Sequence, residues 1–159
     1  MRKAIYAGTF DPITYGHIDV ISRATRIFER VIVGVSAGPK NTLFTHEERT
    51  QLVRAVFRRH RRIDVVGFSS LLVDFASKTG VQTIIRGMRA VSDFDYELQL
   101  TLMNRKLAPG IETIFLMPSE RHIFVSSSLA KEIAALNGDI SELVPALVAR
   151  ALKKKFRTG

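Results

Sequence analysis

Residue types suited to phosphate chemistry are concentrated in three short segments of this 159-residue chain. The first covers residues 8–17, which read Gly-Thr-Phe-Asp-Pro-Ile-Thr-Tyr-Gly-His after a short apolar run. Glycine allows a ligand to approach the backbone closely, and the free amides at the start of a helix attract anions. His17 falls in the first turn of the helix expected next, which predicts an imidazole beside a phosphate-binding turn; taken alone, it also fits a plain polar helix end.

The second and third segments follow two later apolar runs. In residues 85–97, Arg86 and Arg89 flank Gly87-Met88, and the planar guanidinium of arginine binds phosphate oxygens through paired hydrogen bonds. In residues 121–132, three serines stand at an expected helix start, where hydroxyls and amides can wrap a triphosphate, although serine is also a common N-cap. The three segments together predict a site for a ligand with several phosphates.

The elements that must position these segments alternate along the chain. Five apolar runs lack the polar alternation of a half-exposed strand, which is typical of a parallel sheet covered on both faces: residues 3–7, 31–35, 63–66, 81–85 and 113–117. Helical patterns lie between and after them, at residues 17–29, 45–59, 71–78, 93–107, 128–136 and about 141–155. This order predicts one α/β domain over residues 1–159, a doubly wound, Rossmann-like parallel sheet with its ligand outside the carboxyl ends of the strands.

Composition narrows the function classes. The chain has no cysteine, which excludes disulfides, thiolate metal sites and a cysteine nucleophile. No run approaches the roughly 18 apolar residues of a membrane span, and the N-terminus does not read as a signal peptide, so we expect a cytoplasmic protein without membrane contact. The net charge is +9, but the basic runs at residues 58–62 and 153–157 fall at expected helix ends, where cations meet the helix dipole.

The motifs carry a family resemblance. Residues 8–17 resemble the first signature of the nucleotidylyltransferase superfamily, with Thr14 where many members have histidine. Residues 86–97 resemble the Arg-Gly-x-Arg and Asp-Phe-x-Tyr-Glu segment of the bacterial phosphopantetheine adenylyltransferase family, and the three serines resemble that family's Ser-Ser-Ser segment. The likeness runs from about residue 2 to residue 143, with the motifs in the family's order and spacing, and the chain is identified as a member on this basis.

The resemblance implies an activity and its ligands. The family transfers the adenylyl group of ATP to 4'-phosphopantetheine, giving dephospho-coenzyme A and pyrophosphate in coenzyme A biosynthesis. The resemblance also implies a homohexamer and coenzyme A as a feedback inhibitor. We expect Mg²⁺ to be carried on ATP without a protein metal site, because this ion usually keeps several waters and takes few protein ligands. Carried over, the ATP contacts are Thr9, Phe10, His17, Gly87, Met88, Arg89, Glu97, His122, Ile123, Phe124, Val125, Ser126, Ser127 and Ser128. Those to phosphopantetheine are Thr9, Leu72, Arg86 and a lysine in the loop after the second strand.

The position of that lysine is open. A rigid count from the first motif falls on Asn41, whereas a one-residue adjustment of the loop falls on Lys40. We favour Lys40 because the transferred phosphate needs a positive charge and a flexible ammonium can reach from a neighbouring position. In the expected mechanism, the 4'-phosphate attacks the α-phosphorus of ATP in line, with Lys40 placing the nucleophile and His17 stabilising the transition state.

Two other functions compete with this interpretation. A sister nucleotidylyltransferase that uses glycerol phosphate or nicotinamide mononucleotide shares the first motif, but residues 86–97 disfavour it. A nucleic-acid-binding module is compatible with the charge of +9, but the sequence lacks the interleaved aromatic and basic residues on which bases stack. We therefore expect no nucleic acid among the partners.

Overall fold

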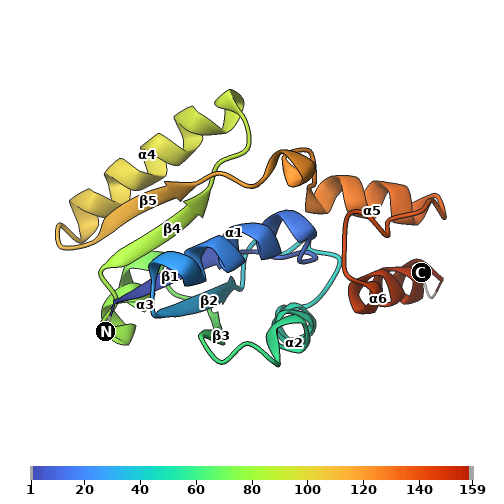
Figure 1. Cartoon of the computed structure of the whole chain (residues 1–159), viewed down its shortest axis with the longest axis horizontal. Helices are drawn as coiled ribbons and strands as arrows, with labels where there is room; N and C mark the ends of the chain where they lie inside the picture. The colour runs from blue at the N-terminus through green and yellow to red at the C-terminus, as the bar shows by residue number, and fades with distance from the viewer. Residues whose placement is uncertain (1, 158–159) are drawn as a thin grey trace.

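The chain folds around one five-stranded parallel sheet. The computed structural model describes residues 2–157, apart from the side chains of residues 91 and 92. The strands lie in the order β3-β2-β1-β4-β5 (Figure 1). Their bounds are β1 (Lys3–Gly8), β2 (Arg30–Ser36), β3 (Ile63–Phe68), β4 (Thr83–Gly87) and β5 (Glu112–Leu116). The predicted doubly wound parallel sheet is therefore confirmed.

Helices connect the strands as the sequence pattern predicts. They are α1 (Tyr15–Ile27), α2 (His46–Phe57), α3 (Leu72–Thr79), α4 (Val91–Leu107), the short 3-10 helix η1 (Glu120–His122), α5 (Ser127–Ala135) and α6 (Ala146–Arg157). Up to α5, each α-helix and each strand lies within two residues of its predicted bounds. None of the described helices is both long and apolar enough to cross a membrane.

The start of the last helix was predicted wrongly. The helix begins at Ala146 rather than near residue 141, because the residue before a proline is disfavoured in the helical conformation and Pro145 has that effect on Val144. The preceding residues form a turn in which the amides of Leu143 and Val144 both donate to the carbonyl of Ile140. The Leu143 carbonyl then accepts from the amide of Tyr15 at 2.9 Å, so the turn holds the start of α1.

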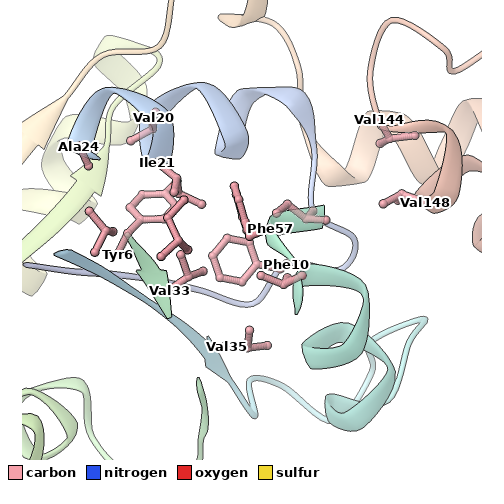
Figure 2. Close-up of a cluster of buried hydrophobic side chains, with 14 of the residues drawn as sticks. Tyr6, Phe10, Val20, Ile21, Ala24, Val33, Val35, Phe57, Val144 and Val148 are labelled. Carbon is pink, nitrogen blue, oxygen red and sulfur yellow. The ribbon is translucent and has the colours of Figure 1, made fainter. Parts of the chain in front are cut away.

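Both faces of the sheet are covered by apolar side chains. Alternate residues of a strand point to opposite faces, and neighbouring Ile5 and Tyr6 of β1 accordingly belong to two different buried clusters. The Tyr6 cluster is covered by α1, α2, α5 and α6, and Figure 2 shows Val20 and Ile21 of α1 above its rings. The Ile5 cluster is covered by α3. This two-sided burial explains why the strands are apolar throughout.

Side-chain caps fix where the helices nearest the strand ends begin. Thr14 and Thr45 each form a capping box with the residue three positions later, at the starts of α1 and α2. Ser126 caps α5 by accepting from the amide of Leu129. Each cap satisfies amides that a helix start otherwise leaves without a partner. The first turns of these helices are therefore held firmly beside the loops that follow the strands.

The strand order places a crevice at the middle of the sheet. From β1 the chain first builds outward through β2 and β3, then returns to add β4 and β5 on the other side of β1. Connections leave β1 and β4 in opposite directions at this point, which opens a crevice outside their carboxyl ends. In Figure 1, α5 and α6 lie at the end of the molecule remote from the start of β1.

Candidate active site

A large cavity occupies the crevice at the carboxyl ends of β1 and β4. Its volume is about 880 Å³. The carboxyl end of each strand, or the segment that follows it, contributes to the wall, through residues such as Thr9, Ser36, Ser70, Arg89 and Ser126. The loops that lead from a helix into the next strand contribute none of the lining residues. The three segments singled out from the sequence thus meet at one site.

His17 lines this cavity from the first turn of α1. Its Nδ1 lies 3.0 Å from the backbone nitrogen of Thr14 and accepts that hydrogen. The proton of the neutral ring is therefore on Nε2, which leaves Nε2–H as the donor. Burial, with a smaller contribution from the positive charge of Arg89, lowers the pKa of His17 to about 4. At neutral pH the site holds a neutral imidazole of defined tautomer.

Phe10 packs against His17 from the side of the core. The two rings meet edge to face at 5.0 Å between centroids, and Phe10 also contacts the ring of Tyr6. Phe10 has a positive φ of 51° and its side chain is buried in the hydrophobic core (Figure 2). A Cβ at Gly8 would lie 3.1 Å from the Phe10 ring, so a larger residue there would have to displace the ring slightly. Phe10 was predicted to contact ATP, but its side chain does not line the cavity.

Arg86 and Glu97 form a partly buried ion pair at the cavity wall. Nε and Nη2 of Arg86 donate to the two carboxylate oxygens of Glu97 at 2.8 and 2.7 Å, and Nη1 donates to the carbonyl of Ala7 at 3.3 Å. Burial alone would lower the pKa of Arg86, but the hydrogen-bonded carboxylate outweighs this and raises it. The resemblance assigns these two residues to different ligands, and the structure joins them into one unit that spans β4 and α4.

Arg89 lies at the corner of the cavity beside the start of α5. Its Nη1 donates to the carbonyl of Val125 at 3.1 Å, and its Nε lies 3.8 Å from a carboxylate oxygen of Asp93. The hydroxyl of Ser127 donates to the carbonyl of Pro12 at 2.7 Å, which ties α5 to the first motif. Val125, Ser126, Ser127 and Ser128 all line the cavity. A guanidinium and a helix N-terminus thus meet at this corner, an arrangement suited to an anion.

The other predicted residues divide into two groups. Gly87 and Leu72 line the cavity, and a Cβ at Gly87 would lie 3.3 Å from the hydroxyl oxygen of Tyr6. Six predicted residues do not line it: Lys40, Asn41, Met88, His122, Ile123 and Phe124.

Five residues of the second group have another place in the structure. Lys40 and Asn41 lie exposed in the loop between β2 and α2. The amide of Met88 donates to Leu116, extending the pairing of β4 with β5. His122 stacks on Tyr15, and the side chain of Phe124 is 84% exposed.

One wall of the cavity was missed by sequence reasoning. Beyond Glu97, helix α4 adds Leu100, Thr101 and Asn104 to the lining, and Tyr96 precedes them. Residues 97, 100, 101 and 104 follow the spacing of one helix face. That spacing is a signal by which the wall could have been predicted once Glu97 was placed in the site. These side chains extend the cavity along α4, away from Arg89.

Asp11 of the first segment holds distant parts of the chain together. Its buried carboxylate accepts from the amides of Leu43 and Phe44, each at 2.9 Å, and from Nζ of Lys131, also at 2.9 Å. Burial would raise the pKa of Asp11, but these hydrogen bonds outweigh it and lower the pKa. The partners lie more than 30 residues away in sequence, so no local pattern could have revealed them.

The cavity is suited to an anionic ligand. Arg86 and Arg89 line it, together with only two carboxylates, Asp93 and Glu97, and Glu97 is already bonded to Arg86. Within residues 2–157, no group of three histidine, aspartate or glutamate side chains is arranged to hold a metal ion.

Comparison with known proteins gives the family. Residues 5–133 match the cytidylyltransferase-like family. The chain is 54% identical over 157 residues to the phosphopantetheine adenylyltransferase of Hahella chejuensis, and the match covers 98% of each chain. It is 52% identical over 156 residues to the phosphopantetheine adenylyltransferase of Alkaliphilus metalliredigens, covering 98% of this chain and 99% of that one. The chain belongs to the phosphopantetheine adenylyltransferase family. The family predicted from the sequence motifs is thereby confirmed.

The fold extends beyond the phosphopantetheine adenylyltransferase family. The nicotinic acid mononucleotide adenylyltransferase of Plasmodium falciparum, solved in complex with NaAD, superposes with a TM-score of 0.71 and covers 96% of this chain and 95% of its own. Its sequence identity is only 17%. At that distance the likeness shows a shared fold, and the choice between branches depends on the sequence.

Proposed function

We propose that this chain transfers the adenylyl group of ATP to 4'-phosphopantetheine and so produces dephospho-coenzyme A and pyrophosphate in coenzyme A biosynthesis. The observation that carries the proposal is identity above 50%, over nearly the whole chain, to two enzymes of that name. The cavity supports it because two arginines line it and define two cationic corners: Arg89 lies beside the start of α5, and Arg86 is paired with Glu97 of α4. Two phosphorylated substrates need two such corners.

The substrates divide between these corners. The triphosphate of ATP binds at Arg89 and the start of α5, where backbone amides and serine hydroxyls accompany a guanidinium. The phosphate of the acceptor binds at Thr9 and Arg86, with Lys40 closing over it from the loop after β2. The pantetheine arm, which is long and carries amides, follows α4 past Leu100 and Asn104.

The reaction needs positioning and charge stabilisation rather than a covalent intermediate. An oxygen of the 4'-phosphate attacks the α-phosphorus of ATP, and the bond from that phosphorus to the bridging β-oxygen breaks as pyrophosphate leaves. The acceptor phosphate is already ionised, so no base has to remove a proton. Neutral His17 donates its Nε2–H to an α-phosphate oxygen as negative charge accumulates there. Arg89 and the amides of α5 hold the leaving pyrophosphate.

The site fits a magnesium ion carried on the nucleotide. Magnesium bound to a triphosphate keeps several of its waters and takes few protein ligands, and Asp93 is the carboxylate nearest to Arg89 at this corner. When bound, the ion neutralises part of the triphosphate charge. Orientation of the α-phosphate still comes from His17 and Arg89.

We extend the proposal to location, inhibition and assembly. The enzyme works in the cytoplasm, where ATP is available and where a chain without cysteine is at no disadvantage. Coenzyme A carries both a pantetheine arm and an adenine nucleotide, so it fits both halves of the cavity and competes with the substrates. The chain assembles as a homohexamer, and the apolar surface of α4 supports self-association: Phe94, Leu98, Leu102, Met103 and Leu107 are all exposed.

A pyrophosphate-release assay with three acceptors tests the reaction. The purified chain is given Mg²⁺-ATP with 4'-phosphopantetheine, glycerol 3-phosphate or nicotinamide mononucleotide in separate reactions. We expect pyrophosphate at an appreciable rate with 4'-phosphopantetheine alone. A comparable rate with either other acceptor would move the chain to a sister branch of the superfamily, and no release with any acceptor would refute the proposed activity.

A further inference from the structure

Arg49 is the largest fully buried side chain of the described residues and has unusual partners. Its side chain lies in the first turn of α2 and is 1% exposed. The guanidinium donates to four backbone carbonyls: Thr9 at 2.5 Å, Ser36 at 2.7 Å, Ala37 at 2.6 Å and Phe44 at 3.2 Å. Together these bonds use all three guanidinium nitrogens.

This arrangement is costly and therefore needs an explanation. Removing a charge from water is unfavourable unless it is fully hydrogen-bonded, and a cation in the first turn of a helix opposes the helix dipole. Burial lowers the pKa of Arg49, and the carboxylate of Asp11 offsets this only in part. A leucine or methionine would fill the same core position at no such cost. The guanidinium is thus retained for the carbonyls that it holds.

Those carbonyls belong to the two loops on the acceptor side of the cavity. Ser36 and Ala37 begin the connection from β2 to α2, and Phe44 lies near its end. The carbonyl of Thr9 belongs to the first motif. Arg49 therefore holds together the two ends of the loop that carries Lys40. It also joins these ends to Thr9, which lines the cavity.

Two further contacts lock the same loop. The Asp11 carboxylate accepts from the amides of Leu43 and Phe44, so the first motif holds the loop's end a second time. Gly38 adopts a positive φ of 66°, and a Cβ there would lie 3.1 Å from the methyl carbon of Thr9. The loop thus packs directly on Thr9. At the ATP corner, by contrast, Arg89 donates to the carbonyl of Val125. Neither Arg49 nor Asp11 takes part in that contact.

We propose that Arg49 is a positioning residue for the acceptor: its guanidinium sets Thr9 and the Lys40 loop relative to each other, so that both meet the acceptor phosphate. This inference rests on the proposed function, because it assigns the acceptor to that half of the cavity. Binding of ATP at the Arg89 corner depends on other contacts and is largely independent of Arg49.

Steady-state kinetics of Arg49→Lys test the proposal. Lysine keeps the charge, but one ammonium cannot hold four carbonyls. Loss of hydrogen bonds to a charged group of this kind corresponds to about a 10- to 100-fold effect, which we expect in the KM for 4'-phosphopantetheine, with the KM for ATP changed less than about threefold. Hydrogen exchange of the free protein provides a second readout: amides of residues 37–45 should exchange faster, with the β1 and β4 amides unchanged.

A matched control separates positioning from general loss of stability. Val148→Ala creates a cavity in the core under α6, where Val148 is fully buried and lines no part of the site. It should lower the thermal midpoint while leaving both KM values and the exchange of residues 37–45 at wild-type levels. Asp11→Asn, which keeps Arg49 but loosens the same loop, should reproduce the acceptor-selective rise in KM.

Failure of the proposed function and failure of the positioning role of Arg49 would give different results. If the wild-type chain releases no pyrophosphate, the proposed function fails, and the exchange of residues 37–45 alone decides whether Arg49 holds the loop. If Arg49→Lys folds and keeps the wild-type KM for the acceptor, or raises both KM values equally, the positioning role is wrong. If Arg49→Lys does not fold, Asp11→Asn decides, and an unchanged acceptor KM in that variant overturns the proposal.

Discussion

The arrangement at His17 assigns it one task. With Nδ1 occupied by the Thr14 amide, the imidazole can only donate through Nε2. With a pKa of about 4, it is not a proton source near neutral pH. A neutral donor fixed in this way contributes when charge develops on an adjacent oxygen. The backbone amide of Thr14 thus fixes the tautomer of His17.

Replacing His17 with alanine should slow catalysis without weakening ATP binding. Loss of one such donor typically lowers kcat by about 10²- to 10³-fold, whereas an interaction absent from the ground state leaves binding nearly unchanged. The kcat, the Kd for ATP and the thermal midpoint are to be measured on one preparation. A near-normal kcat with weakened ATP binding would mean that His17 only shapes the loop.

His17 should also make folding stability depend on pH. Its pKa is 6.5 without perturbation and about 4 in the folded chain. Between these values the unfolded chain binds the proton more tightly, so the free energy of unfolding falls as pH drops from 6.5 to 4, by up to about 3 kcal/mol. Urea unfolding at pH 7 and pH 4.5 should show a smaller drop for His17→Gln than for the wild type. Equal drops would contradict a depressed pKa.

Arg86 and Arg89 should affect different substrates. Arg86→Ala is expected chiefly to weaken 4'-phosphopantetheine binding, and Arg89→Ala chiefly to weaken ATP binding, as measured by calorimetry. Because Arg86→Ala leaves the Glu97 carboxylate without its bidentate partner, the double variant with Glu97→Gln is the appropriate control for an unpaired charge. If both single variants lose the same ligand equally, the division between the corners is wrong.

At the scale of residues, the sequence predicts what lies on a motif and misses what depends on distant partners. The strand-end positions of His17, Arg86 and Arg89 follow from the local pattern of turns and helix starts. The roles of Asp11 and Arg49 depend on carbonyls and amides up to 40 residues away, which only folding brings together. Whether Lys40 or Asn41 serves the acceptor stays a prediction, since both lie in the exposed part of one loop.

At the scale of elements, the start of α2 matters because this helix carries Arg49. Thr45 accepts from the amide of Glu48, whose side chain reaches back to the Thr45 amide at 2.8 Å. Thr45→Ala should lower the free energy of unfolding by about 1 kcal/mol, the usual cost of losing such a cap, as measured by urea titration. Thr45→Ser keeps the hydroxyl oxygen that accepts the hydrogen bond from the Glu48 amide, so this variant should retain most of the stability. Equal stability of the alanine variant would show that the capping box contributes nothing.

Element boundaries followed from chemical markers where those markers act locally. The capping box at Thr45 and the left-handed residue Asn137 mark the start of α2 and the end of α5 in the sequence. The start of α6 was misplaced because residues 141–144 were predicted to be helical, whereas they belong to a turn in which the carbonyl of Leu143 accepts from the amide of Tyr15. The hydrogen bond from Tyr15 to Leu143 and the presence of Pro145 together outweighed the local preference for a helix.

At the scale of the molecule, the exposed apolar side chains of helix α4 bear on the proposed assembly. Its apolar side chains surround the helix instead of facing one core, so several stay exposed in a single chain. Wild-type protein should sediment as six chains of 17.8 kDa. Leu102→Glu, which lies outside the cavity wall, should dissociate the assembly into smaller species. Leu136→Glu at the exposed end of α5 is the control and should sediment as the wild type. A wild-type monomer would contradict the assembly.

The parallel sheet also separates loops whose sequence affects the site from loops whose sequence does not. Every strand-to-helix connection lies at the rim that forms the cavity, whereas every helix-to-strand connection lies at the opposite rim and contributes nothing to its wall. At that far rim, a Cβ added to Gly110 would meet no neighbouring atom within 4 Å. A preference for a different acceptor substrate can therefore arise from changes in the strand-to-helix loops while the core stays the same. The helix-to-strand loops can change in length or sequence without altering the site.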